Sequence, residues 1–588
     1  MPARRLHLRL LQTTDLHGHL RPYDYFLDTP APGTGLSALA GLIETARNST
    51  ENCLLFDCGD LIQGTPFADL LTGHDGPHPM VRALDALRYD AATLGNHDFD
   101  FGFDAALNAF HGAETPILAA NLRTPDATSI YPESILLERD LTDEMGDTVV
   151  FKIGLFGVLP PQTAMWNGHH LSGHAVVTDA LEAAGREAAA LREAGADLVI
   201  ALAHSGLGDM DPIPMAENVS KAILAFDAVD VVLAAHTHQL VPAKDDAAPE
   251  PILQAGAMAS HLGQMDLTLE QDGQAWRIVE VDRQLIAPPP DAPASPLLLA
   301  LSEADHVASL AHIRRTIGES SVPLNSYFNV LGYDAGATLA ADAALDCARS
   351  YAPDAACLAA IAPFRAGGAM GPEFYTDVPK GALLFRHAAE IYLYPNEVRL
   401  IRATGNVIRD WLDHAAGLYH QIDEKSGRQD LIVRDRPPYN ADTMFGLTYE
   451  IDLSKPARFD AEGHQISDQS RIKDLCHEGK PVSDDQTFVV ATNSYRASGG
   501  GGFHWLANCP VVEIPPVVMR DVLASYIERT GQVAPNPRLP FSFTSLGGRQ
   551  ILFETGPGAK AHIGRVSDLG LVIAGTSDEG FLQLGFSL

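Results

Sequence analysis

Two residues that could bind a metal ion follow the first apolar segment of the chain. Asp15 and His17 stand in "LLQTTDLHGHL", residues 10–20, directly after a strand-like run. A carboxylate and an imidazole are also ordinary residues of a solvated strand end, so this pair alone is weak evidence. The metal-site hypothesis therefore depends on whether further ligands follow later strands.

Further candidate ligands do follow later apolar runs. Each has a simpler explanation by itself: Asp60 in "CGDLIQG" could be a turn residue, and His204 or His236 could be a buried core histidine. Taken together, however, five strand ends offer oxygen or nitrogen ligands and none offers Cys. Such a mixed set suits two divalent ions such as Mn, Zn, Fe or Co better than a Cys-rich structural zinc. The candidate ligands are Asp15, His17, Asp60, Asn96, His204, His236 and His238.

Alternating helices and strands are expected to position these ligands. "SALAGLIETARN" and "PMVRALDALRYD" have helical periodicity, and "TDALEAAGREAAALREAG" predicts a helix capped by Thr178 or Asp179. "NCLLFDCGD", "VVFKIGLFGVL", "ADLVIALAHSG" and "DAVDVVLAAHTH" predict strands. This alternation predicts a layered α/β domain, in which ligands gather beyond the carboxyl ends of the strands.

Length and composition limit the classes of protein to consider. A chain of 588 residues exceeds the size at which single cores stop growing, so more than one domain is expected. The formal charge of −34 would repel a polyanion and argues against binding of long nucleic acid. The six cysteines form no CxxC pair, and no apolar run is long enough for a membrane span. The N-terminal residues show no signal peptide, so we expect a cytoplasmic protein, or a periplasmic one if a leader is missing.

The motifs D-x-H, G-D-x-x-x-G, G-N-H-D-F-D, H-S and H-x-H, in this order, resemble the calcineurin-like metallophosphoesterases over residues 8–265. The resemblance implies a four-layer αββα sandwich with two divalent metal ions. It implies that Asp15, His17 and His238 bind one ion, that Asn96, His204 and His236 bind the other, and that Asp60 bridges both. It further implies that His97 and Asp100 form a catalytic dyad, because an imidazole can meet charge that develops on the phosphoryl group or the leaving oxygen.

The second half of the chain resembles the C-terminal domain of the 5'-nucleotidase family, in segments such as "NSYFNVLGYD", "FGLTYEIDL" and "ATNSYRASGGGGF". Within that family, "APFRAGG" and "IYLYPN" are most similar to the bacterial 2',3'-cyclic-nucleotide 2'-phosphodiesterase/3'-nucleotidases. The Asn-x-Gly-Gly-x-Arg loop expected of a true 5'-nucleotidase is replaced by residues 362–365, Ala-Pro-Phe-Arg. The resemblance implies a smaller α+β nucleotide-binding domain in which Tyr439 and Phe503 sandwich the base and Arg365 contacts the ribose or phosphate region. One aromatic residue of the relatives' Tyr-Asn-Phe-Asp motif is Ala441 here.

The predicted organisation has four parts. They are a metallophosphoesterase domain at 1–285, a linker and connecting helix at 286–322, a substrate-binding domain at 323–545 and an extension of unknown role at 546–588. The Pro-rich stretch "IAPPPDAPASP" at 286–296 marks the main boundary.

We therefore expect a dimetal hydrolase that opens 2',3'-cyclic nucleotides to 3'-nucleotides and dephosphorylates these to nucleosides. A 5'-nucleotidase or a sulfur-oxidation hydrolase on a similar scaffold is one alternative. A nucleotide-binding receptor with a vestigial site is another, although binding alone does not need His97 and Asp100. The expected partner is a small nucleotide, with no membrane involved.

Overall fold

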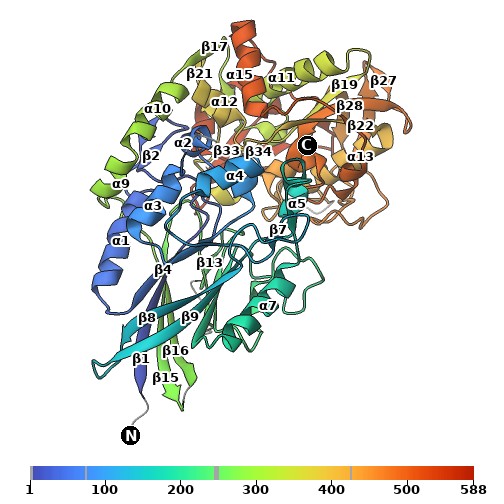
Figure 1. Cartoon of the computed structure of the whole chain (residues 1–588). Coiled ribbons are helices and arrows are strands. Elements are labelled where there is room, and N and C mark those ends of the chain that lie inside the picture. The colour runs from blue at the N-terminus through green and yellow to red at the C-terminus, as the bar shows by residue number, and fades with distance from the viewer. Residues whose placement is uncertain (1–3, 73–75, 244–249, 274, 424–426) are drawn as a thin grey trace. The chain divides into compact units, whose positions relative to one another are not determined.

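The computed structural model describes residues 4–72, 76–243, 250–273, 275–423 and 427–588 (Figure 1). The chain forms two compact units, which divide between His312 and Ile313. Across the described ranges, no helix combines the length and the apolar character needed to cross a bilayer.

The first unit contains a six-stranded sheet in the order β16-β15-β1-β4-β5-β6. β1 pairs with β4 in parallel and with β15 antiparallel, and β4 and β5 are also parallel. In Figure 1, β15 and β16 lie beside β1 although they come about 250 residues later in the chain. The strands are β1 (Arg5–Thr13), β4 (Cys53–Asp57), β5 (Ala91–Thr93), β6 (Ile117–Leu118), β15 (Leu262–Asp272) and β16 (Ala275–Ile286).

A second six-stranded sheet has the order β13-β14-β12-β11-β9-β8. β11 is parallel to both β9 and β12, with Ala203 opposite Val158 and Ala234. All six residues of β11, Leu198–Ala203, are buried, as expected of a central parallel strand covered on both faces. The other strands are β8 (Ser134–Thr142), β9 (Thr148–Val158), β12 (Val231–Ala234), β13 (Leu240–Val241) and β14 (Ile252–Ala255).

The two sheets pack face to face through one apolar core. Leu8, Leu10 and Phe56 from the first sheet and Ile153 and Ile200 from the second belong to the same buried cluster. These side chains alternate along their strands with residues that face the other way, which places one apolar face of each sheet toward its partner. The two sheets are therefore the inner two layers of the fold.

Helices cover the outer faces of both sheets and complete the predicted αββα arrangement. On the second sheet, Ala184, Ala188 and Leu191 of α7 pack against Val199 and Val232. α7 (Ala180–Glu193) begins at Asp179, one of the two expected caps, whose side chain accepts the Glu182 N–H at 2.9 Å. The remaining helices of the unit include α1 (Leu36–Asn48), α2 (Pro66–Leu71), α3 (Pro79–Leu87), α4 (Phe103–Phe110), α5 (Thr163–Trp166), α6 (Gly168–Leu171), α8 (Ser220–Leu224), α9 (Pro296–Leu301) and α10 (Glu303–Ile313).

The second unit is α+β, as expected. Its central sheet has the order β24-β19-β28-β22-β29 and mixes parallel with antiparallel pairs. The strands are β19 (Cys357–Ile361), β22 (Val398–Thr404), β24 (Thr443–Phe445), β28 (Thr487–Asn493) and β29 (Val511–Val512). The longer helices are α11 (Ala335–Tyr351), α12 (Phe385–Ile391), α13 (Gly405–Ala415) and α15 (Met519–Thr530).

Two segments lie differently from the predicted domain ranges. Residues Thr316–Ser320, expected within the linker and connecting helix at 286–322, form strand β17 of the second unit. The extension at 546–588 forms β32 (Gln550–Thr555), β33 (Val572–Thr576) and β34 (Leu582–Ser587), which make a sheet with β23 (Gln429–Asp430). Ile551, Phe553 and Leu584 enter the main core of this unit, so the extension is an integral part of its fold.

Candidate metal centre

Seven candidate ligands lie just beyond the carboxyl ends of five strands in the first unit. Because β1, β4 and β5 run parallel, as do β11 and β12, these ends meet at one edge of each sheet. Asp15 and His17 follow β1, Asp60 follows β4, Asn96 follows β5, His204 follows β11, and His236 and His238 follow β12.

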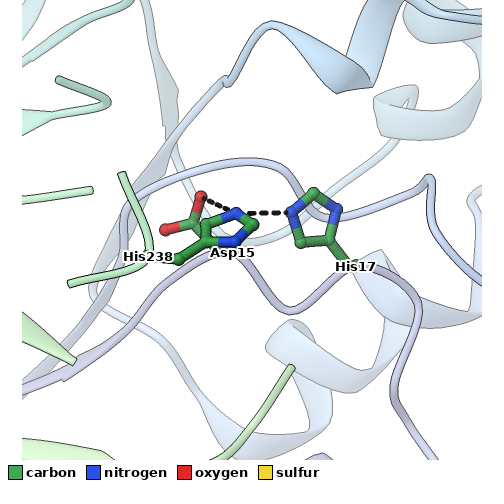
Figure 2. Close-up of side chains that lie close together, drawn as sticks. All are labelled: Asp15, His17 and His238. Atoms are coloured by element: carbon green, nitrogen blue, oxygen red, sulfur yellow. Dashed lines mark hydrogen bonds and ion pairs between the residues drawn. The ribbon is translucent and has the colours of Figure 1, made fainter. Parts of the chain in front are cut away.

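Asp15, His17 and His238 form one cluster whose ligand atoms lie within 4.8 Å of one another. The Nε2 atom of His238 lies 3.4 Å from Oδ1 of Asp15 and 3.1 Å from Nε2 of His17 (Figure 2). His17 Nδ1 lies 3.0 Å from the carbonyl oxygen of Gln63. A carbonyl can only accept, so Nδ1 carries the proton and the Nε2 lone pair points into the cluster.

Asp60, His204 and His236 form a second cluster of the same size. His204 Nδ1 lies 2.7 Å from the Cys58 carbonyl oxygen, which again leaves Nε2 as the ligand atom. Oδ2 of Asp60 lies 3.2 Å from His204 Nε2 and 3.9 Å from Nε2 of His17 in the first cluster. The Asp60 carboxylate therefore stands between the two clusters, where a bridging ligand is needed.

The unpartnered polar atoms of this region match a metal site. Within the described part of the chain, Asn96 Oδ1 is buried and makes no hydrogen bond, while the buried atoms Asp60 Oδ2 and His204 Nε2 meet no hydrogen-bond geometry and lie 3.2 Å apart as a charged pair. Burying such atoms without better partners is costly unless a cation coordinates them. The donors are carboxylate, amide and imidazole without sulfur, and this set fits two divalent cations.

Burial and charge act in opposite directions on the ionisable ligands. Burial lowers the pKa of His17 to about 3, which keeps its ring neutral and able to ligate. Burial would raise the pKa of Asp60, but the charges of His204 and His97 outweigh it and hold this pKa well below its usual range. Burial likewise lowers the pKa of His204, yet the Asp60 carboxylate more than offsets this and raises it. If His204 binds an ion through Nε2, the ion must displace the proton from this ring wherever the ring is charged.

The backbone of the ligand loops is unusual. Asp15, His17, Asp60, His236 and His238 all have φ between +47° and +72°, a left-handed region that residues other than Gly rarely adopt. Such conformations cost free energy and persist where the surrounding structure imposes them, most often at functional sites. Five of the seven candidate ligands thus have their side chains directed by a strained main chain.

Gly95 allows two ligands to approach each other. A Cβ atom at this position would lie 2.1 Å from Oδ1 of Asp60 and 2.6 Å from the ring of His204. No side chain fits there without displacing both ligands. A glycine is therefore required at position 95, because only a residue without a side chain leaves room for Asp60 and His204.

His97 and Asp100, the predicted dyad, lie together at the edge of the centre. His97 Nδ1 is 2.8 Å from Asp100 Oδ2, and the His97 N–H donates to Oδ1 of Asp60 at 2.8 Å. Burial lowers the pKa of His97, but the charges of Asp100 and Asp60 outweigh it and raise this pKa. The His97 side chain is 32% exposed, so it is accessible from solvent.

Asp98 also belongs to this site, although it was not among the residues predicted from the sequence. Its buried carboxylate accepts the backbone N–H groups of Asp60, Leu61, Ile62 and Gly95 at 2.8–3.1 Å. One side chain thereby ties the loop after β4 to the loop after β5, and with it Asp60 to Asn96. In the sequence, only its position next to His97 in "GNHD" points to this role, because most of its hydrogen bonds are made with residues 60–62, which are distant in sequence.

The three residues predicted to contact the substrate lie in the second unit and differ in how far they are exposed to solvent. Tyr439 is partly buried in a 3-10 turn, Pro438–Asn440, whereas Phe503 is 0% exposed. Arg365 is 7% exposed, with its guanidinium carbon 4.7 Å from the ring centre of Phe374.

Tyr439 and Phe503 are joined by Arg496, which the sequence argument did not single out. The Arg496 guanidinium carbon lies 3.9 Å from the ring centre of Phe503, and Nη2 donates to the Tyr439 carbonyl at 2.8 Å. Its Nε donates to Oδ2 of Asp442 at 2.7 Å. The ring of His414 meets Phe503 edge-on at 4.3 Å. Arg496 and His414 of the same unit thus pack against the buried Phe503 ring, and its role in stacking a base stays a prediction.

Comparisons with known proteins agree with this architecture. Residues 8–240 match the model of the calcineurin-like phosphoesterase family, and residues 316–508 match the 5'-nucleotidase C-terminal domain. A 2',3'-cyclic-nucleotide 2'-phosphodiesterase/3'-nucleotidase of Salmonella typhimurium is 36% identical over 95% of this chain and 92% of its own length. The trifunctional nucleotide phosphoesterase protein YfkN of Bacillus subtilis is 33% identical over 98% of this chain, which spans only 42% of that relative.

A solved structure from Staphylococcus aureus, provisionally described as a 5'-nucleotidase, is similar in fold. It has a TM-score of 0.74 at 19% identity and covers 91% of this chain and 99% of its own. At this identity the likeness concerns the fold alone.

Proposed function

The chain belongs to the family of 2',3'-cyclic-nucleotide 2'-phosphodiesterase/3'-nucleotidases, which are metal-dependent phosphoester hydrolases, and we propose that it acts on the substrates for which this family is named. It would open 2',3'-cyclic nucleotides to nucleoside 3'-phosphates and then hydrolyse these to nucleoside and phosphate. The observation that carries the proposal is the pair of adjacent ligand clusters with the His97–Asp100 pair at their edge. The likeness over nearly the whole of this chain and of the Salmonella relative supports the choice of substrate.

We assign Asp15, His17 and His238 to one divalent ion and Asn96, His204 and His236 to the other, with Asp60 shared. When bound, two ions of this kind can activate a water molecule and neutralise charge on the phosphoryl oxygens. The native metal is proposed to be among Mn, Zn, Fe and Co, because imidazole with carboxylate and amide oxygens suits these ions.

His97 and Asp100 supply the proton chemistry in this proposal. Asp100 accepts a hydrogen bond from Nδ1 of His97 and fixes the direction of the ring. The raised pKa of His97 keeps a proton on the imidazole, which it can donate to the departing ribose oxygen. The same group serves both steps, because the leaving atom is a ribose oxygen in the cyclic ester and in the 3'-phosphate.

Selectivity for nucleotides is assigned to the second unit. We propose that Tyr439 offers an aromatic face to the base and that Arg365 and Phe503 contribute to the same pocket, as the resemblance implies. Phosphoryl transfer needs mainly positioning and charge neutralisation, so the metal centre alone would accept many esters. The expected partner is a small nucleotide rather than long nucleic acid, since the chain carries a formal charge of −34. The cytoplasmic location expected from the sequence stays a prediction.

Phosphate release from a substrate panel tests the proposal. The metal-loaded protein is assayed with 2',3'-cyclic AMP, 3'-AMP, 5'-AMP and a small aryl phosphate that has no base. We expect the highest kcat/KM for the first two compounds, with 3'-AMP accumulating transiently from the cyclic ester. A preference for 5'-AMP would indicate the 5'-nucleotidase alternative, and binding without turnover would indicate a receptor.

A further inference from the structure

The imidazole of His236 is held by two side chains that have no role in the proposed metal shell. Its Nε2 atom lies 2.8 Å from Oε1 of Glu217. The ring of Trp166, at the end of α5, stacks on it with centroids 5.7 Å apart and planes inclined by 26°. On the main-chain side, the His236 N–H donates to the Asp15 carboxylate at 3.2 Å.

The contact with Glu217 determines which ring nitrogen of His236 can ligate. A carboxylate is an acceptor only, so Nε2 must carry the proton of the neutral ring. Nδ1 is then the nitrogen with a free lone pair, and His236 belongs to the cluster with Asp60 and His204. A histidine without such a partner would divide its population between two tautomers, of which only one can bind an ion in this orientation.

The loop that carries Glu217 begins and ends close to the candidate metal centre. It starts at Ser205, next to His204, and its other end at Val219 contacts Ser205 again. The Ser205 hydroxyl donates to the Glu217 carbonyl at 3.0 Å and accepts the Val219 N–H at 2.9 Å. One serine adjacent to His204 thus fixes the backbone between Glu217 and Val219.

Two close approaches stabilise the same loop. The side chain of Asn218 accepts the Gly206 N–H at 2.8 Å. Gly208 has φ +63°, and a Cβ atom there would lie 1.8 Å from the Asn218 carbonyl oxygen, so no other residue fits. The two ends of the loop at residues 206–217 are therefore held together by contacts that do not involve the Glu217 side chain. That side chain is 39% exposed.

We propose that Glu217 is a positioning residue that holds His236 in the tautomer with Nδ1 free, while Trp166 restricts rotation of the ring. The inference rests on the proposed dimetal centre and adds a residue outside the assigned ligands. Histidine ligands commonly donate their second nitrogen to a carboxylate, which orients the ring and increases its basicity. Glu217 acts on one cluster only, because its contact is with His236 and not with the Asp15, His17 and His238 group.

Metal titration without substrate tests this role. Mn²⁺ is added to the metal-free full chain, and bound and free ions are measured by electron paramagnetic resonance. For Glu217→Ala we expect one of the two sites to weaken by about 10–100-fold, as is typical for loss of such a partner. Glu217→Gln should recover most of this loss, because its amide oxygen still accepts from Nε2.

The matched control is Asp211→Asn, which removes the same charge from an exposed position of the same loop. It should leave both Mn²⁺ affinities unchanged. Unchanged affinities in Glu217→Ala would overturn the proposal, as would equal weakening of both sites or an equal effect of Asp211→Asn. Nitrogen-15 spectra of the His236 ring in the metal-free protein add a second readout, since the fraction of the Nε2-protonated form should be higher in the wild type than in Glu217→Ala, and an unchanged fraction would count against the proposal.

The titration also separates this proposal from the proposed substrate. A wild-type chain that binds two Mn²⁺ ions, responds to Glu217→Ala and releases no phosphate from nucleotides would support the role of Glu217 and reject the substrate. A wild-type chain with fewer than two sites would reject the dimetal centre and, with it, the role of Glu217.

Discussion

Nδ1 of His97 lies 2.8 Å from Oδ2 of Asp100, three residues further along the same short turn. We expect His97→Ala to retain both metal ions and to lose about 10²–10⁴-fold in kcat, as for removal of a positioned general acid. Metal analysis and steady-state kinetics on 3'-AMP measure the two effects separately. Normal turnover in this variant would show that His97 is only a turn residue.

Asp60 should matter to both ions, because its carboxylate stands between the two clusters. Asp60→Asn removes the charge and should weaken both sites by more than the roughly 10–100-fold typical of an outer-shell partner. His238→Ala should mainly weaken one site and serves as the comparison. The readout is metal content after mild chelation, and two fully occupied sites in Asp60→Asn would contradict the assignment.

Asp98 is expected to be a structural requirement of the centre. Asp98→Ala leaves four backbone N–H groups without their buried acceptor, at about 1–3 kcal/mol for each unsatisfied group that water cannot reach. We expect a clearly lower melting temperature together with weaker binding of both ions. Asp104→Asn, at an exposed position in the first turn of α4, should cost less than about 1 kcal/mol. Equal stability of the two variants would argue against this role.

Metal affinity should rise with pH above neutrality. The pKa of His204 is raised from 6.5 by Asp60, so the protonated pair stabilises the metal-free protein below pH 6.5 and this contribution is lost as the pH rises through the folded-state value. Binding must remove that proton, which gives an affinity gain of up to about tenfold per pH unit while His204 is still protonated. Calorimetry in buffers of different ionisation enthalpy measures the protons released, and zero release at pH 7 would contradict the prediction.

The second unit allows two roles of its aromatic residues to be separated. Phe503 is 0% exposed, so Phe503→Ala should cost about 3–5 kcal/mol of stability, as for other buried aromatic residues. Tyr439→Ala is expected to lower kcat/KM for 3'-AMP by an amount equivalent to about 1–3 kcal/mol of stacking, and to spare an ester without a base. An equal decline with both substrates would indicate that Tyr439 supports the fold instead.

Residue types and their order were sufficient to predict the α/β class, the two-part organisation and the presence of a metal centre. The reason is physical: parallel strands meet at their carboxyl ends, so polar residues after successive apolar runs must converge. Asp15, Asp60 and His204 could therefore be grouped without coordinates. The αββα sandwich was confirmed, and the structure brings six of the seven predicted ligands into two compact clusters.

Other features were decided only by the tertiary structure, because they depend on contacts between segments that are distant in sequence or on backbone angles that residue type does not specify. The four N–H groups that converge on Asp98 come from two loops, and Glu217 reaches His236 through a loop closed by Ser205. The left-handed conformations of Asp15 and Asp60 are uncommon for residues other than Gly, and they persist because the surrounding fold imposes them. Likewise, the burial of Phe503 follows from its packing under Arg496, which nothing in its own glycine-rich segment indicates.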